Sequence, residues 1–378
     1  MTEEIVDLSE EECVDLFGGI SGRWYQLAAR NQVENAILAG SMRICVVLPT
    51  GSGKTATSGL IFSSPKIRKH LGVLPGEKLK LLFVAHKHRL LTQAERTYAK
   101  AENIELIPHS AFAEIPADLT WHIACIDEFQ HEAMSTIQYQ LEKLGNHPII
   151  GLTATPTRGD GCLLKYDVEV NPISREQAVK EGWLSPTHIH SFVDVSGHDK
   201  VNVLTDIFTA YSHQMGNTFV FVRTKKEVSA ITLVLQNLGH AAVGLLNQTD
   251  KELNTILDDF SQGKWKFIVN CGKLGEGIDV RGCTDVVLGR QLGSYILTNQ
   301  IIGRTTRPDS PSAVWELISP LSAGNIDSTV IVGIPESHRL VSKEGGKWIE
   351  RAFNYVTHRT NKQLGIAPVK RTNRIQFT

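Results

Sequence analysis

The stretch LPTGSGKT, residues 48–55, decides the fold of this chain. It follows the apolar, β-branched run RICVVLP, which is short enough to be a buried strand, and it leads into TATSGLIFSS, which can continue as a helix. A glycine-rich turn between a strand and a helix points the amide groups of the helix start at a polyphosphate. The stretch therefore predicts a phosphate-binding loop in an α/β domain, although a glycine-rich turn without a ligand has the same local pattern.

Each residue type in this phosphate loop (residues 48–55) has a chemical role. Glycines let the backbone approach a phosphate, a lysine reaches the β and γ oxygens, and a hydroxyl can ligate magnesium. The residues expected to bind the nucleotide are Thr50, Gly51, Ser52, Gly53, Lys54 and Thr55. Lys54 is expected to act in catalysis, and Thr55 is an expected Mg²⁺ ligand. Leu48 stands where the common GxxxxGK(S/T) pattern has its first glycine.

Two adjacent carboxylates follow a second apolar run further along the chain. In HIACIDEFQH, residues 122–131, the segment 123–126 is typical of a buried strand, and Asp127 and Glu128 come directly after it. A parallel strand ends at the ligand edge of its sheet. Asp127 is therefore expected to hold Mg²⁺, and Glu128 to orient and deprotonate the attacking water. Taken alone, such a pair could equally lie in a solvated turn.

Length and composition indicate two globular domains. The chain has 378 residues, 42% hydrophobic and 21% charged, and single cores seldom grow beyond about 250–300 residues. No apolar run reaches the roughly 18 residues of a membrane span. The acidic N-terminal segment does not resemble a signal peptide, so we expect a cytoplasmic protein without a membrane partner. The net charge of -1 at pH 7 confines any nucleic-acid surface to a local patch.

Further motifs follow in the order that is typical of superfamily-2 helicases and translocases, and the chain resembles that family over roughly residues 20–320. The motifs that carry this resemblance are GRWYQLAARNQV, LLFVAHKHRLLTQ, GLTATPTRGDG, LGEGID and NQIIGRTTRP. The family accepts other residues at the first loop position, which accounts for Leu48. The resemblance implies an α/β fold of two tandem RecA-like domains, parallel sheets flanked by helices, with ATP and Mg²⁺ as cofactors.

The resemblance assigns roles to residues of the first domain. Gln26 is expected to hydrogen-bond the adenine edge, with Arg23 or an aromatic neighbour packing nearby. The residues expected to contact the nucleic-acid backbone are His86, Lys87 and Arg89, joined by Arg223 from the second domain. The residues expected to couple the ATP site to nucleic acid are Gln130, Thr153 and Thr155. Gln130 stands where relatives usually carry histidine or aspartate, but its amide can still bond toward a threonine, so hydrolysis should survive.

The second domain is expected to complete the same site. Gly277 is expected to face the nucleotide and Asp279 to position the ribose or an arginine. Gln300, Arg304 and Arg307 match the pattern QxxGRxxR, and the two arginines lie one helical turn apart on one helix face. By resemblance, they reach across an interdomain cleft to the charge that develops on the phosphate.

The domain boundaries follow from these motifs. We expect an ATP-binding domain over residues 1–195, a helicase C-terminal domain over 196–325, and a C-terminal helix with a basic tail over 326–378. The tail carries Lys370, Arg371 and Arg374, which either meet nucleic-acid phosphates or form a solvated end. A monomer is expected.

The resemblance implies an ATP-dependent DNA helicase or translocase that acts on single-stranded or branched DNA. The RNA-specific DEAD-box pattern fits poorly, because the chain has TAT in place of SAT. The RadD and UvsW groups of bacteriophage and bacterial DNA repair and recombination fit better. An RNA remodelling enzyme and an ATP-switched binding module without unwinding remain as alternatives. No Glu-x-Lys triplet is present for a metal-dependent nuclease.

Overall fold

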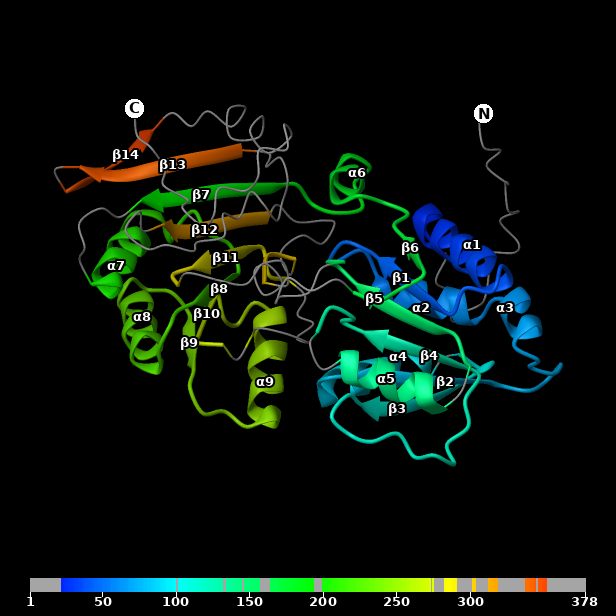
Figure 1. Ribbon diagram of the computed structural model, residues 1–378. Coiled ribbons are helices and arrows are strands. Elements are labelled where there is room, and N and C mark those ends of the chain that lie inside the picture. Colours follow the sequence, from blue (N-terminus) through cyan, green and yellow to red (C-terminus); the bar gives the residue numbers. More distant parts are fainter. Residues whose placement is uncertain are drawn as a thin grey trace. The chain divides into compact units, whose positions relative to one another are not determined.

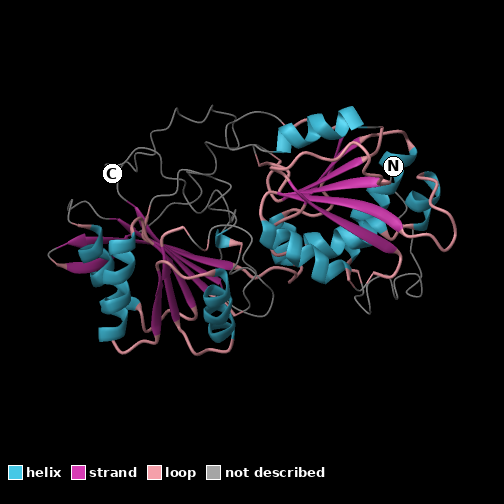
Figure 2. Ribbon diagram, turned by 90° about the horizontal axis from the view of Figure 1, so that it is seen from below, coloured by secondary structure: helices cyan, strands magenta, loops and turns pink. Residues whose placement is uncertain are grey.

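The computed structural model describes residues 22–99, 101–131, 134–144, 146–156, 164–193, 199–272, 274, 282–290, 301–303, 312–318, 337–344 and 346–351. The chain divides into two units between Ser174 and Arg175. Each unit has its own sheet with its own helices (Figures 1 and 2).

The first unit contains a parallel sheet in the order β3-β2-β4-β5-β1-β6. Its strands are β1 (Arg43–Val47), β2 (Leu79–Ala85), β3 (Ile104–Ser110), β4 (Ile123–Asp127), β5 (Ile149–Thr153) and β6 (Val168–Val170). Its helices are α1 (Trp24–Leu38), α2 (Lys54–Phe62), α3 (Pro65–His70), α4 (His88–Tyr98) and α5 (Met134–Leu144). Helices cover both faces of this sheet (Figure 2), so its central strands are continuous apolar runs.

The second unit contains a sheet in the order β14-β13-β7-β12-β11-β8-β10-β9. Its strands are β7 (Thr187–Val193), β8 (Thr218–Phe221), β9 (Ala242–Leu245), β10 (Phe267–Asn270), β11 (Asp285–Leu288), β12 (Ser312–Ile318), β13 (Ser337–Glu344) and β14 (Lys347–Arg351). Its helices are α6 (Arg175–Lys180), α7 (Lys200–Tyr211), α8 (Lys225–Asn237) and α9 (Asp250–Ser261).

Successive side chains of β8 belong to two different hydrophobic cores, one on each face of the second sheet. Phe219 packs with Phe260 of α9, whereas Val220 belongs to the cluster that contains Phe208 of α7 and Val228 of α8. Because side chains alternate along a strand, a fully apolar strand must be covered on both sides. The layered α/β architecture that the sequence predicted follows from this packing.

The division between Ser174 and Arg175 lies earlier in the sequence than the predicted boundary at residue 195. The reason is β7, which pairs in parallel with β12 and β13 of the second sheet. The preceding helix α6 also lies in the second unit. The segment that the sequence assigned to the end of the first domain thus starts the second unit.

The predicted C-terminal helix is wrong for residues 337–351. This segment forms the antiparallel hairpin β13–β14, which departs from the otherwise parallel pairing. Leu340 and Val341 are buried, Gly346 has φ 80° in the turn, and the Trp348 ring packs edge-on against Phe192 at 5.3 Å. Successive residues of a strand point to opposite faces of the sheet, so the hairpin buries the adjacent Leu340 and Val341 on both faces of the sheet edge. The basic tail, residues 352–378, lies outside the described residues.

Within the part of the chain that the structure describes, no helix combines the length and apolar character needed to cross a membrane.

Candidate active site

The carboxyl ends of four neighbouring strands bring the predicted site residues together. β1 pairs with β5 so that Val47 lies opposite Thr153, and β5 pairs with β4 so that Leu152 lies opposite Asp127. β2 lies beside β4 (Figure 1). Since parallel strands end at one edge of their sheet, the phosphate loop, the carboxylates and the TAT segment share that edge.

The phosphate loop has a conformation that depends on its glycines. Gly51 has φ 89° and Gly53 has φ 88°, in the left-handed region that favours glycine. A Cβ atom on Gly53 would also lie 2.9 Å from Nε2 of Gln26. Ser52 closes the turn by donating from its backbone N and its Oγ to the carbonyl of Pro49, at 3.1 and 2.7 Å. The loop therefore holds its shape through its own hydrogen bonds.

Side chains of helix α1 form hydrogen bonds with the backbone of this loop. The Tyr25 hydroxyl donates to the Ser52 carbonyl at 2.7 Å and accepts from Nη1 of Arg23 at 2.9 Å. Gln26 is 4% exposed; its Nε2 faces the carbonyls of Ser52 and Gly53 at 3.4 and 3.5 Å, while its Oε1 accepts from the Arg23 backbone N. The predicted adenine-recognition segment thus adjoins the phosphate loop. Sequence reasoning singled out Gln26 and missed the loop contact of Tyr25.

Lys54 and Glu128 meet across two loops. Nζ of Lys54, the first residue of α2, lies 3.4 Å from Oε1 of Glu128, and each side chain is 15% exposed. The backbone N of Glu128 donates to Oδ1 of Asp127 at 3.0 Å. The phosphate-binding lysine and the expected catalytic carboxylates thus share one site.

Asp127 is a half-buried carboxyl at the end of β4, and its pKa is raised to about 6. Burial is the largest cause, and the negative charge of Glu128 adds to it, whereas Lys54, the Glu128 backbone N–H and His86 act in the opposite direction. A divalent cation would favour the ionised carboxylate. Hard oxygen donors suit Mg²⁺, so Asp127 and the Thr55 hydroxyl fit as its ligands.

Glu128 has an unusual backbone conformation. Its φ is 52°, and among the described residues no other non-glycine residue has a positive φ. Hydrogen bonds fix this turn: the backbone N of Phe129 donates to the Leu152 carbonyl and that of His131 to the Glu128 carbonyl, both at 2.9 Å. The Phe129 ring packs where Gly151 has no side chain, because a Cβ there would lie 2.4 Å from the ring. Strained backbone of this kind concentrates at functional sites.

Gln130 connects the carboxylates to the TAT segment. Its Nε2 donates to Oε2 of Glu128 at 2.6 Å, and its Oε1 accepts from the Thr153 hydroxyl at 2.6 Å. Thr153 Oγ1 also lies 2.7 Å from the Thr155 carbonyl and accepts from the Thr155 backbone N at 2.9 Å. The Thr155 hydroxyl is buried without a hydrogen-bond partner. The structure therefore contains the amide-to-threonine bond that the sequence suggested for Gln130, while its coupling role stays a prediction.

The residues predicted to contact nucleic acid differ in accessibility. Lys87 and Arg89, at the start of α4, are partly exposed, and Arg223, between β8 and α8, is exposed. His86 is only 7% exposed, and its ring stacks on that of His131 with centroids 4.2 Å apart. The phosphate contacts of Lys87, Arg89 and Arg223 stay predictions, and the His86 ring is buried. Sequence reasoning did not single out His131.

The second-domain residues predicted for the ATP site lie outside the described residues. They are Gly277, Asp279, Gln300, Arg304 and Arg307. The neighbouring Ile301 and Ile302 are buried in the core beside Phe219. At the end of β10, Oδ1 of the buried Asn270 accepts from the backbone N of Gly272 and Leu274 at 3.1 and 3.3 Å. Asn270 thus positions the start of the glycine-rich segment, a role that its position after an apolar strand could have suggested.

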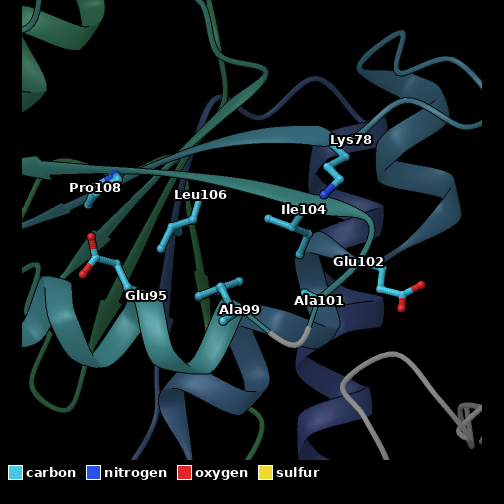
Figure 3. Close-up of a pocket in the computed structure, with 9 residues that line it drawn as sticks. Lys78, Glu95, Ala99, Ala101, Glu102, Ile104, Leu106 and Pro108 are labelled. Atoms are coloured by element: carbon cyan, nitrogen blue, oxygen red, sulfur yellow. The ribbon is translucent and has the colours of Figure 1, made fainter.

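A cavity of about 630 Å³ lies elsewhere in the first unit, between α4 and β3 (Figure 3). Its lining residues are Lys78, Glu95, Tyr98, Ala99, Ala101, Glu102, Ile104, Leu106 and Pro108. None of them is a predicted site residue. The Tyr98 hydroxyl shares a 2.6 Å hydrogen bond with Ser58 of α2. The lining thus contains no residue of the phosphate loop, residues 48–55.

Two family models match the chain. Residues 19–114 match the type III restriction enzyme res subunit, and residues 199–309 match the helicase conserved C-terminal domain. The first match contains the phosphate loop, and the second contains the segment of Arg304 and Arg307.

Similar proteins match this chain over most of its length. The protein irc3 of Schizosaccharomyces pombe, named as a mitochondrial ATP-dependent helicase, is 26% identical over 337 residues, which is 75% of this chain and 55% of irc3. This chain thus spans little more than half of that relative. The restriction-modification enzyme LlaBIII bound to DNA superposes with TM-score 0.63 at 16% identity, over 83% of this chain and 29% of its own.

A third similar protein is Dbp5 of Saccharomyces cerevisiae, solved with RNA and ADP BeF3. It superposes with TM-score 0.55 at 14% identity, over 85% of this chain and 94% of its own. At these identities the superpositions establish the fold, which is an α/β fold of two RecA-like domains, as the sequence predicted.

Proposed function

We propose that the chain is an ATP-dependent DNA helicase or translocase of superfamily 2, which its two matched domains and its α/β fold of RecA-like domains support. The observation that carries the proposal is the 3.4 Å approach of Lys54 to Glu128 beside the half-buried Asp127. A lysine on a phosphate loop next to an acid pair is the arrangement that ATP hydrolysis requires.

Each residue of the first unit has a distinct task in hydrolysis. Lys54 offsets negative charge on the β and γ phosphates. Asp127 and Thr55 would hold Mg²⁺, which neutralises charge on the phosphate oxygens when bound. Glu128 orients the attacking water and accepts its proton. Gln130 fixes one carboxylate oxygen of Glu128, so that the other faces Lys54.

The second unit contributes groups that we assign from its motifs. Gly277 and Asp279 face the nucleotide, and Gln300, Arg304 and Arg307 complete the site, with the two arginines stabilising the developing phosphate charge. Replacing Arg307 with alanine is expected to leave nucleotide binding intact and to slow hydrolysis. A variant with weaker ATP binding and an unchanged rate would contradict this assignment.

DNA is the preferred partner in this proposal. The similarity to LlaBIII, solved with DNA, supports it, and Lys87, Arg89 and Arg223 are the cationic residues proposed to contact phosphates. The type of system, phage or bacterial DNA repair and recombination as in the RadD and UvsW groups, is proposed from the motifs alone. The similarity to Dbp5, solved with RNA, favours an RNA remodelling enzyme as the second candidate.

Steady-state ATPase measurements with single-stranded DNA, forked DNA and RNA, together with unwinding of the forked substrate, test the proposal. Lys54→Ala is expected to reduce turnover by at least about 100-fold, because a charge on the reacting phosphate is lost. Lys69→Ala is the matched control, since Lys69 is an exposed lysine in the last turn of the neighbouring helix α3. Normal turnover by Lys54→Ala would refute the assignment.

The ATPase assays with DNA and with RNA distinguish the proposed functions from one another. Stimulation by RNA and not by DNA would move the conclusion to the RNA enzyme. Nucleic-acid binding that depends on ATP without unwinding or movement would indicate an ATP-switched binding module.

A further inference from the structure

Two histidines link the predicted nucleic-acid side of the first unit to its carboxylates. His86 follows β2 directly, and His131 follows Gln130. Their strands are neighbours in the sheet, with Val84 opposite Ile126. The two imidazole rings stack with centroids 4.2 Å apart and an angle of 15° between their planes. The pair therefore joins two segments that are 45 positions apart in sequence.

On one side, the stack is continuous with the turn that carries exposed cations. His86 is 7% exposed, and it directly precedes Lys87, the N-cap of α4, and Arg89 in the first turn. Its inward ring and their partly exposed side chains belong to one short turn. A phosphate held by the cations would thus fix the backbone that sets the position of the His86 ring.

On the other side, the stack is continuous with the backbone of the catalytic acid. The His131 backbone N donates to the Glu128 carbonyl at 2.9 Å, closing the turn in which Glu128 has φ 52°. Residues in this region of backbone space keep their conformation only when their surroundings fix it. A displacement of His131 would therefore change the direction of the Glu128 side chain.

We propose that the His86–His131 stack is a positioning pair, which transmits occupancy of the nucleic-acid turn to Glu128 and so sets the stimulated rate of ATP hydrolysis. This inference rests on the proposed function. Neither ring is assigned a reaction with ATP; both act through the position of Glu128. Stacked rings transmit displacement because packed groups have few alternative arrangements.

The test is ATP hydrolysis by the full chain, with and without single-stranded DNA or RNA, together with nucleic-acid affinity from fluorescence anisotropy. His131→Ala is expected to lower the stimulated kcat by about tenfold, since small misplacements of a catalytic group are costly. Its KM for ATP and nucleic-acid Kd are expected to stay within about twofold of wild type, and its unstimulated rate to fall less than the stimulated rate, because the variant keeps the backbone N–H that donates to the Glu128 carbonyl. His131→Phe, which keeps a flat ring, is expected to restore most of the stimulation.

A double-mutant cycle distinguishes coupling from separate structural effects. His86→Ala is expected to lose stimulation too, and the variant with both alanines to be no worse than the more affected single variant. His109→Ala on β3 is the control, because His109 bonds locally to the Ala113 carbonyl. Thermal unfolding midpoints confirm that each variant is folded.

Several results would overturn the inference. They are full stimulation in His131→Ala, equal loss of the basal and stimulated rates, failure of His131→Phe to recover, or multiplying effects of the two alanine substitutions. If Lys54→Ala still hydrolyses ATP normally, the proposed function fails. If wild type hydrolyses ATP without stimulation by any nucleic acid, the stack has nothing to transmit and the inference fails while the ATPase assignment stands.

Discussion

Replacing Gln130 with alanine tests how strongly the Glu128 carboxylate depends on its neighbour. Gln130 is 3% exposed, and its Nε2 donates to the Glu128 carboxylate at 2.6 Å. A hydrogen bond to a charged group contributes about 1.5–3 kcal/mol. The second bond, from Thr153, adds little to the loss, because the Thr153 hydroxyl also lies 2.7 Å from the Thr155 carbonyl.

If this bond holds Glu128 in its catalytic orientation, its full value is lost in the transition state. A loss of about 1.5–3 kcal/mol corresponds to a fall of about 10- to 150-fold in kcat. KM for ATP should change little, because Gln130 contacts the acid and the TAT segment and not the phosphate loop. Gln130→His, which restores a donor and an acceptor, is expected to recover most of the rate.

The assay is steady-state ATPase at saturating ATP and nucleic acid, with kcat and KM measured separately. Gln177→Ala is the matched control, since Gln177 makes the same amide-to-carboxylate bond to Glu181 at 2.9 Å on an exposed helix. A Gln130→Ala enzyme within twofold of the wild-type kcat would refute this account of Glu128. A loss that tracks a lower unfolding temperature would refute it as well.

Three further predictions concern the same unit. Asp127 is protonated below its pKa of about 6, so the Mg²⁺ concentration that supports half-maximal ATPase should rise about tenfold per pH unit below that value; a flat profile between pH 5 and 6 would contradict this. Because the pKa of Asp127 is higher in the folded than in the unfolded state, the free energy of unfolding without Mg²⁺ should fall as the pH rises from about 4 to 6. Asp127→Asn should remove this dependence on pH. Gly151→Ala should lower stability by about 1–3 kcal/mol, because its Cβ would lie 2.4 Å from Phe129; in a chain that also carries Phe129→Ala, which removes the ring, Gly151→Ala should cost little, and an equal cost with and without the ring would argue against the clash. Tyr25→Phe should raise KM for ATP and cost about 1 kcal/mol of stability, since the 2.7 Å bond to the Ser52 carbonyl is lost; an unchanged KM would leave Tyr25 a purely structural role.

The sequence predicted the parts of the site that depend on local chemistry. A β-branched run, two glycines and a lysine require a strand, a left-handed turn and a helix start, and Gly51, Gly53 and Lys54 have these conformations. The same holds for Asp127 and Glu128 at the end of β4. In each case the residue types leave the backbone few alternatives.

The features that the sequence did not predict depend on pairing between distant segments. The run THIHSFV, residues 187–193, is a good strand in either unit, and only its pairing with β12 and β13 places it in the second. The hairpin β13–β14 carries charged residues, as edge strands do. In the sequence alone, such a charged segment looks the same as a solvated helix or tail. The stack of His86 on His131 needs the register of β2 on β4, which no local pattern contains.

The strained backbone of Glu128 connects stability with catalysis in this unit. A non-glycine residue in the left-handed region costs on the order of 1–3 kcal/mol, so other contacts must hold it there. Phe129 supplies one by packing on Gly151, and Gln130 supplies another through the carboxylate itself. His131 supplies the third through the Glu128 carbonyl. Three consecutive residues thus hold Glu128, and they contact the sheet at Gly151, the TAT segment at Thr153 and the ring of His86.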